Sequence, residues 1–327
     1  MRPRGPRVGL VLGAGGVVGQ AYHAGVLAAL EHDHGWDPRT ADVIVGTSAG
    51  SITGSLLRSG VPASELSAWT VQAPLTTEGR LLEELFGTEH PDFQPFRAID
   101  VIRRRPRLPG VGMVLHALTR PRQFRPLTAA LSLLGDGDHD IFEQLAALER
   151  VDARGWPEQD LWINAVRRED GRHVLFGHPE TPTVPWHRAV AASCAVPGYF
   201  APVRIGDKTY VDGGAHSPTS ADVLRELDLG LVIVISPMSG PPGLPRDFFG
   251  ASRLHSARLA RQEVKALRAA GTEVVAFRPG PSEQAVMGND FMESARVQQI
   301  VQESFLAAGA RAARPEVRER LSALCTS

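Results

Sequence analysis

Cysteine is scarce: Cys194 and Cys325 are the only two in 327 residues. Two thiols so far apart in the sequence provide neither a disulfide framework nor a metal-binding cluster, and we expect both to be reduced. No other set of His, Cys, Asp and Glu has metal-ligand spacing. We therefore expect no metal and no cofactor.

A charge excess and long apolar runs are also lacking. The formal net charge is −1, which gives no reason to expect nucleic acid as a partner. No apolar run approaches the roughly 18 residues of a membrane-spanning helix. With 43% hydrophobic and 22% charged residues, the composition is typical of an ordinary globular protein. We expect a single domain, residues 1–327, in the cytoplasm.

The first apolar run, residues 8–18, follows three arginines and resembles a secretory signal. Glycines interrupt the run, however, and a helix is predicted to follow at residues 20–30. We therefore interpret the run as a buried first strand.

A glycine-rich loop, Gly13-Ala14-Gly15-Gly16-Val17-Val18-Gly19, joins that strand to the helix. Such a loop can hold a dinucleotide pyrophosphate, or it can present backbone N–H groups to an oxyanion. The dinucleotide motif requires a glycine where Val18 stands and an acidic residue where Gly46 ends the second strand. The pattern favours an oxyanion site over a nucleotide. A loop that merely packs tightly is the structural alternative.

A nucleophile-elbow pattern follows the second apolar run, residues 43–45. The sequence Gly46-Thr47-Ser48-Ala49-Gly50 matches GxSxG between a predicted strand and a predicted helix. A serine hydroxyl is a weak nucleophile, so it must stand on a sharp turn that a base, a substrate and backbone donors can all reach. The flanking glycines leave room for that turn. The alternative is an ordinary turn in which Ser48 caps a helix.

Together with Tyr210-Val211-Asp212-Gly213-Gly214 and the segment 192–202, these motifs resemble the patatin-like phospholipases over positions 9–214. The resemblance implies that Ser48 is the nucleophile and that Asp212 is its general base, in a dyad without histidine. It also implies an oxyanion hole made by the amides of Gly15 and Gly16, with Gly13 and Ala14 supporting them. Four further glycines would support the two turns: Gly46, Gly50, Gly213 and Gly214. The sequence departs from the family pattern in two ways. Val18 stands where the family usually has a basic residue, and the spacing from the glycine loop to the helix is one residue longer.

The expected reaction is hydrolysis of a lipid carboxylic ester through an acyl-serine. Because a carboxylate with a pKa near 4 is a weak base, we expect a partly dry site that raises the pKa of Asp212. Phospholipid, lysophospholipid, neutral glyceride and short soluble esters all remain candidate substrates. Two other hypotheses remain: a Ser-His-Asp esterase of the α/β-hydrolase type that uses His216 or His255, and a catalytically silent scaffold that binds lipid or protein.

Strands alternate with helices along the chain, which predicts an α/β fold with a mostly parallel central sheet covered by helices on both faces. Further strands are expected at 161–166, 173–176, 208–211, 231–236 and 273–277. Helices are expected at 63–71, 78–86, 140–150, 186–195, 252–270, 293–312 and 314–324.

Residues 91–137 differ from the rest and are predicted to form a basic, proline-rich helical cap or insertion. Between Arg97 and Arg125 there are eight arginines and one acid, Asp100, interleaved with apolar residues. One interpretation is a solvated surface insertion. The other is a cap over the serine whose residues 97–125 make peripheral contact with an anionic membrane.

Overall fold

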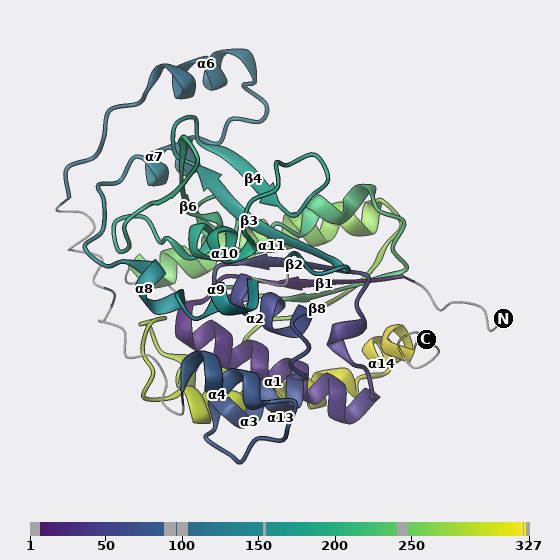
Figure 1. Ribbon diagram of the computed structural model, residues 1–327. Coiled ribbons are helices and arrows are strands. Elements are labelled where there is room, and N and C mark those ends of the chain that lie inside the picture. Colours follow the sequence, from purple (N-terminus) through teal and green to yellow (C-terminus); the bar gives the residue numbers. More distant parts are fainter. Residues whose placement is uncertain are drawn as a thin grey trace.

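The computed structural model describes residues 7–87, 96, 104–152, 155–240, 248–322 and 324. An eight-stranded sheet with the order β5-β6-β3-β2-β1-β7-β8 lies at its centre, and β4 pairs with β3 outside this path (Figure 1). The strands are β1 (Val8–Leu12), β2 (Val43–Thr47), β3 (Asp160–Arg167), β4 (Arg172–Phe176), β5 (Val203–Ile205), β6 (Lys208–Asp212), β7 (Leu231–Ile235) and β8 (Glu273–Phe277).

The prediction of a mostly parallel sheet is confirmed. β1, β2, β3, β7 and β8 are parallel to one another. β4 and β6 run antiparallel to β3, and β5 runs antiparallel to β6.

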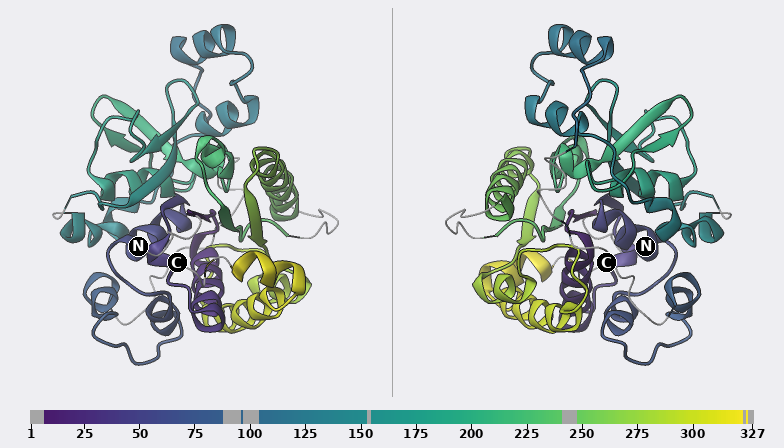
Figure 2. Two further views of the ribbon diagram at one scale, coloured as in Figure 1. Left: turned by 90° about the vertical axis from the view of Figure 1, so that its right-hand side faces the viewer. Right: turned by 90° about the vertical axis from the view of Figure 1, so that its left-hand side faces the viewer.

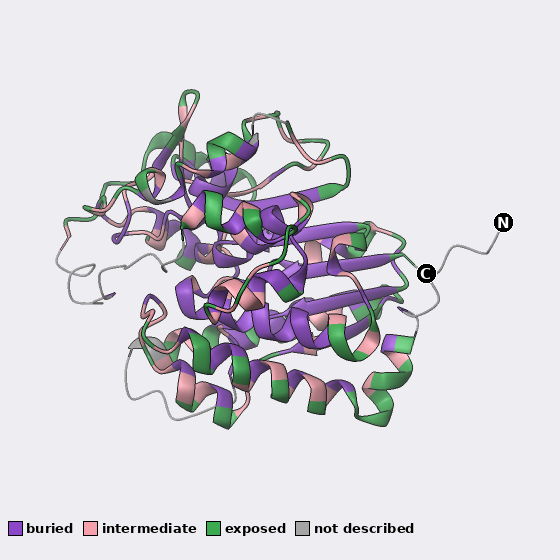
Figure 3. Ribbon diagram, turned by 60° about the horizontal axis from the view of Figure 1, so that its bottom comes forward, coloured by how far each residue is buried: buried purple, intermediate pink, exposed green. Residues whose placement is uncertain are grey.

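The central strands are apolar throughout because helices cover both of their faces. Alternate residues point to opposite faces, so Leu10 and Ile44 belong to one hydrophobic cluster while Val11 and Val43 belong to another. Figure 3 shows these strands as a buried layer between helices whose outer faces are exposed.

One face is covered by α1 (Gly16–His34) and α13 (Val297–Ala312), which pack against each other, and by α2 (Ala49–Arg58). The other face is covered by α11 (Phe248–Ala269) and η3 (Ala221–Glu226). Figure 2 shows α11 on the opposite side of the sheet from α1 and α13. The remaining elements are η1 (Pro38–Thr40), α3 (Ala63–Thr70), α4 (Arg80–Phe86), α6 (Val111–Thr119), α7 (Pro126–Ser132), α8 (Ile141–Leu145), α9 (Leu148–Asp152), α10 (Trp186–Cys194), η2 (Gly213–Ala215), α12 (Pro281–Met287) and α14 (Pro315–Leu321).

Several predicted helices differ from those observed in their bounds: the helix expected at 252–270 is α11, and the one expected at 293–312 is α13, which begins at Val297. The first helix begins at Gly16 and not at residue 20, because the glycine loop itself turns into the helix. The helix expected at 140–150 is divided into α8 and α9. Its predicted start is correct, since the Asp140 side chain accepts a hydrogen bond from the Phe142 N–H.

The predicted insertion, residues 91–137, contains α6 and α7, and its residues 91–95 and 97–103 lie outside the described residues. α6 projects at the top of Figure 1. Among the described residues, none of the helices combines the length and the apolar character needed to cross a bilayer.

Candidate active site

Ser48 stands on a strained turn between β2 and α2. Its φ of 53° and ψ of −121° are unusual for a residue other than glycine and cost about 1–3 kcal/mol. The two flanking glycines are needed for close packing: a Cβ on Gly46 would lie 2.6 Å from Ser51 Cα, and one on Gly50 would overlap the carbonyl oxygen of Leu12. The sharp turn expected from GxSxG is therefore present.

The register of β3 brings the distant residue Asp212 to this turn. β2 and β6 lie along the same edge of β3, one after the other, and they run in opposite directions. Thr47, the last residue of β2, is opposite Asn164, and Asp212, the last residue of β6, is opposite Ala165. The carboxyl ends of the two strands consequently meet.

The side chains of Ser48 and Asp212 interact, and this interaction favours the ionised form of Asp212. Both residues are buried, with 6% and 4% of their surface exposed. Burial raises the pKa of Asp212 to about 7, although the interaction with Ser48 and the hydrogen bond from the Gly214 N–H oppose the rise. The Gly214 N–H donates to Asp212 Oδ1 at 2.7 Å. Asp212 thus combines an interaction with Ser48 with a pKa suited to proton transfer near neutral pH.

The glycine loop lies beside both residues but its amides are not equivalent. The Gly13 N–H donates to the Ile235 carbonyl oxygen at 2.9 Å, and the Ala14 N–H donates to that of Pro218 at 2.7 Å. These two amides hold the loop in place and are already engaged. Within the described part of the chain, no acceptor is found for the amides of Gly15 and Gly16, which leaves both available to an oxyanion.

The loop also requires glycine for steric reasons. Gly16 has φ +60°, and a Cβ there would overlap the carbonyl oxygen of Phe291. A Cβ on Gly15 would lie 2.7 Å from Gly19 Cα. On the other side of the loop, a Cβ built on Gly214 would lie 3.5 Å from Ala14 Cβ. The glycine loop and the Asp-Gly-Gly turn are therefore neighbours. A Cβ on Gly213 would likewise press on the Asn164 backbone, at 2.5 Å from its carbonyl oxygen.

Several residues that fix the elbow were not recognised from the sequence. The Ser193 hydroxyl accepts the Ser48 N–H at 2.9 Å, and the Ser51 hydroxyl donates to the Ser48 carbonyl oxygen at 2.7 Å. Asn164 Nδ2 donates to Thr47 Oγ1 at 2.9 Å and to the Gly46 carbonyl oxygen at 3.2 Å. Ser193 lies in the segment 192–202 that resembles the family, which was the available signal for it.

Cys194 is a buried free thiol close to the site. Its sulfur lies 3.7 Å from Ser51 Oγ, and it also interacts with Ser48 and Asp212. Burial and the nearby Asp212 carboxylate raise the pKa of the Cys194 thiol, which keeps it neutral. Cys325 lies outside the described residues.

A buried carboxylate, Glu263 of α11, holds the loop that anchors the glycine loop. It accepts hydrogen bonds from the hydroxyls of Ser217 and Thr219, at 2.5 and 2.6 Å, and from the Ala221 N–H at 2.9 Å. Pro218, within this segment, accepts the Ala14 N–H. Burial raises the pKa of Glu263.

His216, a candidate triad base, lies in a stacked pair with His173. Its ring stacks on His173 with centroids 4.3 Å apart and the planes at 2°. His173 Nε2 in turn donates to Asn164 Oδ1 at 2.6 Å. Burial lowers the pKa of His173 to about 4 and that of His216 to about 2, so both rings are neutral. The interactions that set the pKa of Asp212 come from Ser48 and Gly214 and not from a histidine.

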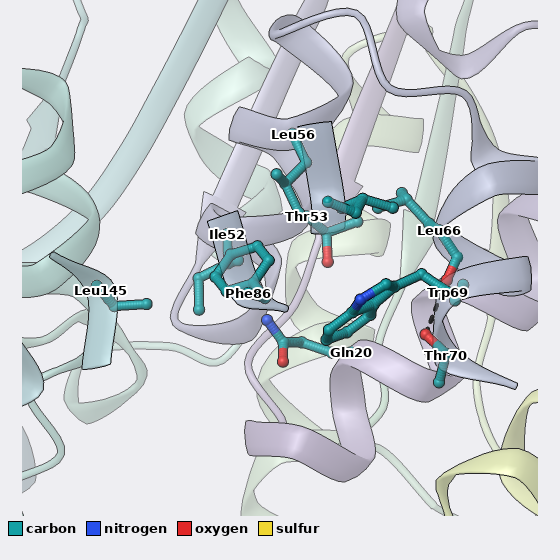
Figure 4. A pocket seen from close by; sticks show the side chains of 11 residues that line it. Gln20, Ile52, Thr53, Leu56, Leu66, Trp69, Thr70, Phe86 and Leu145 are labelled. Atoms are coloured by element: carbon teal, nitrogen blue, oxygen red, sulfur yellow. Dashed lines mark hydrogen bonds between the residues drawn. The ribbon is translucent and has the colours of Figure 1, made fainter. Parts of the chain in front are cut away.

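An apolar pocket opens one helical turn from the site. It has about 610 Å³ of empty space, part of it open to solvent. Ile52 lies one turn after Ser48 on α2, and Gln20 lies one turn after Gly16 on α1. Figure 4 shows Gln20, Trp69 and Phe86 directed into the same space. The lining residues are Gln20, Ala24, Ile52, Thr53, Leu56, Leu66, Trp69, Thr70, Leu82, Phe86 and Leu145.

Two solved structures resemble this chain at low sequence identity. The type III effector protein ExoU has 16% identity and a TM-score of 0.37, with 98% of this chain and 54% of that chain covered. VipD from Legionella pneumophila has 13% identity and a TM-score of 0.37, with 92% and 67% covered. The chain thus spans about half the length of ExoU. No curated protein matches.

A family model described as patatin-like phospholipase matches residues 10–225. The match covers more than half of the chain and includes the glycine loop, the elbow at Ser48 and the turn at Asp212. The chain therefore belongs to the patatin-like phospholipase family.

Proposed function

We propose that this protein is a serine acyl hydrolase that cleaves carboxylic esters of lipids through a Ser48–Asp212 dyad and an acyl-serine intermediate. The observation that carries the proposal is the meeting of Ser48 and Asp212 at the adjoining ends of β2 and β6, next to the unengaged amides of Gly15 and Gly16. Family membership supports lipid ester hydrolysis as the general activity.

Acylation begins when Ser48 Oγ attacks the ester carbonyl carbon and its proton passes to the Asp212 carboxylate. The negative charge that develops on the carbonyl oxygen is bound by the amides of Gly15 and Gly16. Loss of one such donor typically costs about 3–4 kcal/mol of transition-state stabilisation. The tetrahedral intermediate then collapses as protonated Asp212 gives its proton to the leaving alcohol, and the acyl group remains on Ser48.

Deacylation repeats the sequence with water. Asp212, now a carboxylate again, accepts a proton from water as the water oxygen attacks the acyl-serine carbonyl carbon. Collapse of the second tetrahedral intermediate releases the carboxylic acid and returns the proton from Asp212 to Ser48. A pKa of about 7 makes Asp212 a stronger base than an exposed aspartate while leaving it ionised above neutral pH.

The apolar pocket fits the acyl chain of such an ester. Its lining residue Ile52 lies one helical turn after Ser48, and the lining is mainly aliphatic and aromatic, including Trp69 and Phe86. An alkyl chain that leaves water for such a pocket gains about 0.8 kcal/mol per CH₂ group. We therefore infer a preference for acyl chains of more than a few carbons.

Covalent labelling tests the dyad directly. The wild-type chain should react with a fluorophosphonate, whereas Ser48→Ala should not, and Asp212→Asn should react slowly. Ser59→Ala, at the other end of α2, is the matched control and should react as the wild type does. Hydrolysis of p-nitrophenyl esters of increasing chain length and of phospholipid vesicles would then identify the substrate. Labelling that persists in Ser48→Ala would refute the proposal.

The two rival functions make different predictions. A silent scaffold would bind lipid but would neither react with the fluorophosphonate nor hydrolyse any ester. A Ser-His-Asp triad would lose activity when His216 and His255 are both replaced. The dyad predicts that the His216→Gln/His255→Gln variant keeps most of the wild-type turnover.

A further inference from the structure

One helix in the insertion exposes the face that would normally be buried. Val111, Val114, Leu115 and Leu118 follow the i, i+3, i+4, i+7 spacing and form a continuous apolar stripe on the solvent side of α6. Leu118 is 75% exposed and Val111 is 85% exposed. Leu108, just before α6, is 90% exposed. Exposed clusters of this kind mark interaction surfaces.

The concentration of these side chains is specific to this part of the chain. Seven large hydrophobic side chains are exposed among the described residues, and six of them lie between Leu108 and Leu127. The seventh is Leu306, on α13. We call the six the α6–α7 face: Leu108, Val111, Val114, Leu115, Leu118 and Leu127.

Contacts on the opposite side hold α6 in this orientation. Met113 and His116 are its buried side chains. His116 Nδ1 donates to the Asp170 carbonyl oxygen at 2.8 Å, and Met113 Cε lies 3.7 Å from the ideal Cβ position of Gly171. These contacts attach α6 to the turn between β3 and β4, so the apolar stripe points outward.

The segment that carries the α6–α7 face has charged residues of one sign only. Six arginines and no acidic residues occur between residues 104 and 133. Arg104 pairs with Asp138 at 2.6 Å, and Arg125 donates to the His216 carbonyl oxygen at 3.1 Å. Arg120 and Arg122, directly after α6, are exposed. An apolar stripe bordered by arginines matches the acyl boundary and the anionic headgroups of a lipid surface.

The face is connected to the elements that hold the candidate base. Leu131, at the end of α7, packs against a small cluster formed by Val166, Val211 and Ala215. Val211 precedes Asp212 on β6, and Ala215 ends η2, which follows it. A membrane that binds α6 and α7 would therefore contact elements that pack at the same end of β6 as the candidate active site.

We propose that the α6–α7 face docks on anionic lipid membranes. The proposal rests on the proposed function in one respect, because it is the lipid substrate that requires docking. A second copy of the chain is a poorer occupant, since it would bring a second Arg120 and Arg122 against the first. Docking would place the leucines and valines among the acyl chains and Arg120 and Arg122 among the headgroups.

Co-sedimentation of the full chain with vesicles tests the proposal. Binding should be stronger to phosphatidylcholine vesicles that contain phosphatidylglycerol than to phosphatidylcholine alone, and it should fall with added salt. Leu115→Ser/Leu118→Ser should lower the partition coefficient about ten-fold or more. Arg120→Glu/Arg122→Glu should lower it about five-fold or more for each arginine. Because these side chains are exposed, the variants should fold, as circular dichroism would verify.

Matched controls come from elsewhere in the chain. Leu306→Ser removes the other exposed leucine, and Arg314→Glu/Arg318→Glu reverses two exposed charges near α14. Both should bind vesicles as the wild type does. Equal losses in the controls, or wild-type binding that ignores anionic lipid and salt, would overturn the proposal. A stable dimer that Leu115→Ser/Leu118→Ser dissociates would also overturn it, because the face would then be a protein interface.

The outcome is separable from that of the proposed function. Hydrolysis of a soluble short ester should be unchanged in Leu115→Ser/Leu118→Ser, whereas hydrolysis of vesicle phospholipid should fall with binding. If Ser48→Ala binds vesicles and the wild type hydrolyses no ester, the membrane site stands and the hydrolase proposal fails. If soluble ester is cleaved but no vesicle is bound, the hydrolase proposal stands and the membrane site fails.

Discussion

Replacing Asp212 with asparagine should abolish turnover and, at alkaline pH, make the protein more stable. Asp212 is 4% exposed, and burial raises its pKa from 3.8 to about 7. In the unfolded chain the same carboxyl ionises near pH 4. Above neutral pH, folding must therefore hold an ionised carboxylate in a site that disfavours the charge.

The magnitude follows from the pKa difference between the unfolded and folded states. A rise from 3.8 to about 7 corresponds to about 4 kcal/mol of lost stability at high pH. The loss is absent below pH 4, where both states are protonated, increases between pH 4 and pH 7, and is constant above pH 7. Asparagine has no such penalty, but its amide group must find new partners at Ser48. We expect a net gain of about 1–3 kcal/mol for the Asp212→Asn variant at pH 8.5.

Urea unfolding of wild type and Asp212→Asn at several pH values between 4.5 and 9 would measure this difference. All other titrating groups are common to the two proteins, so the pH dependence of their stability difference isolates Asp212. The difference should increase from pH 4.5 to about pH 7 and then level off. A difference that does not change with pH, or a variant that is less stable than wild type at pH 8.5, would show that Asp212 is not held in a dry site.

Three further predictions concern catalysis. The value of kcat/KM for a soluble ester should rise with pH along a limb centred near 7, because only ionised Asp212 can accept a proton; a limb centred near 4 would contradict this. Gly16→Ala should slow fluorophosphonate labelling about 100-fold or more, because its Cβ would overlap the Phe291 carbonyl oxygen and displace an oxyanion donor. Gly35→Ala, at the similar φ of +61° but with open space around it, should label normally. Ile52→Trp, which fills the pocket next to the nucleophile, should shift ester preference to short acyl chains; an unchanged chain-length profile would place the acyl chain elsewhere.

The parts of the site that local chemistry dictates were predictable from the sequence. Gly46 and Gly50 flank Ser48 because side chains at either place would collide with neighbouring backbone, and only a few residue types meet that demand. The buried strands were equally readable, since apolar runs of about five residues bounded by glycine or polar residues have few other uses. The expected dry environment of Asp212 is present as well.

The parts of the site that could not be predicted depend on contacts between residues far apart in the sequence. Ser193 and Asn164 stabilise the elbow through hydrogen bonds across the sheet, and neither has a local pattern that distinguishes it from any other polar residue. The engagement of the Gly13 and Ala14 amides by Ile235 and Pro218 is likewise set by strands far along the chain. The outward orientation of α6 could not be predicted, because periodicity gives the apolar stripe but not the side that it faces.

The edge of β3 sets the separation of Ser48 and Asp212. Because Asn164 and Ala165 fix where β2 and β6 end, this separation does not depend on how much chain connects the two strands. The connecting segments, such as the one that holds α6 and α7, can lengthen or change without altering the separation. Deleting one residue from the middle of β3 would instead turn its side chains to the opposite face and shift one partner by a full step. Sequence diversity should therefore be tolerated in the long connections and resisted in these two adjacent positions.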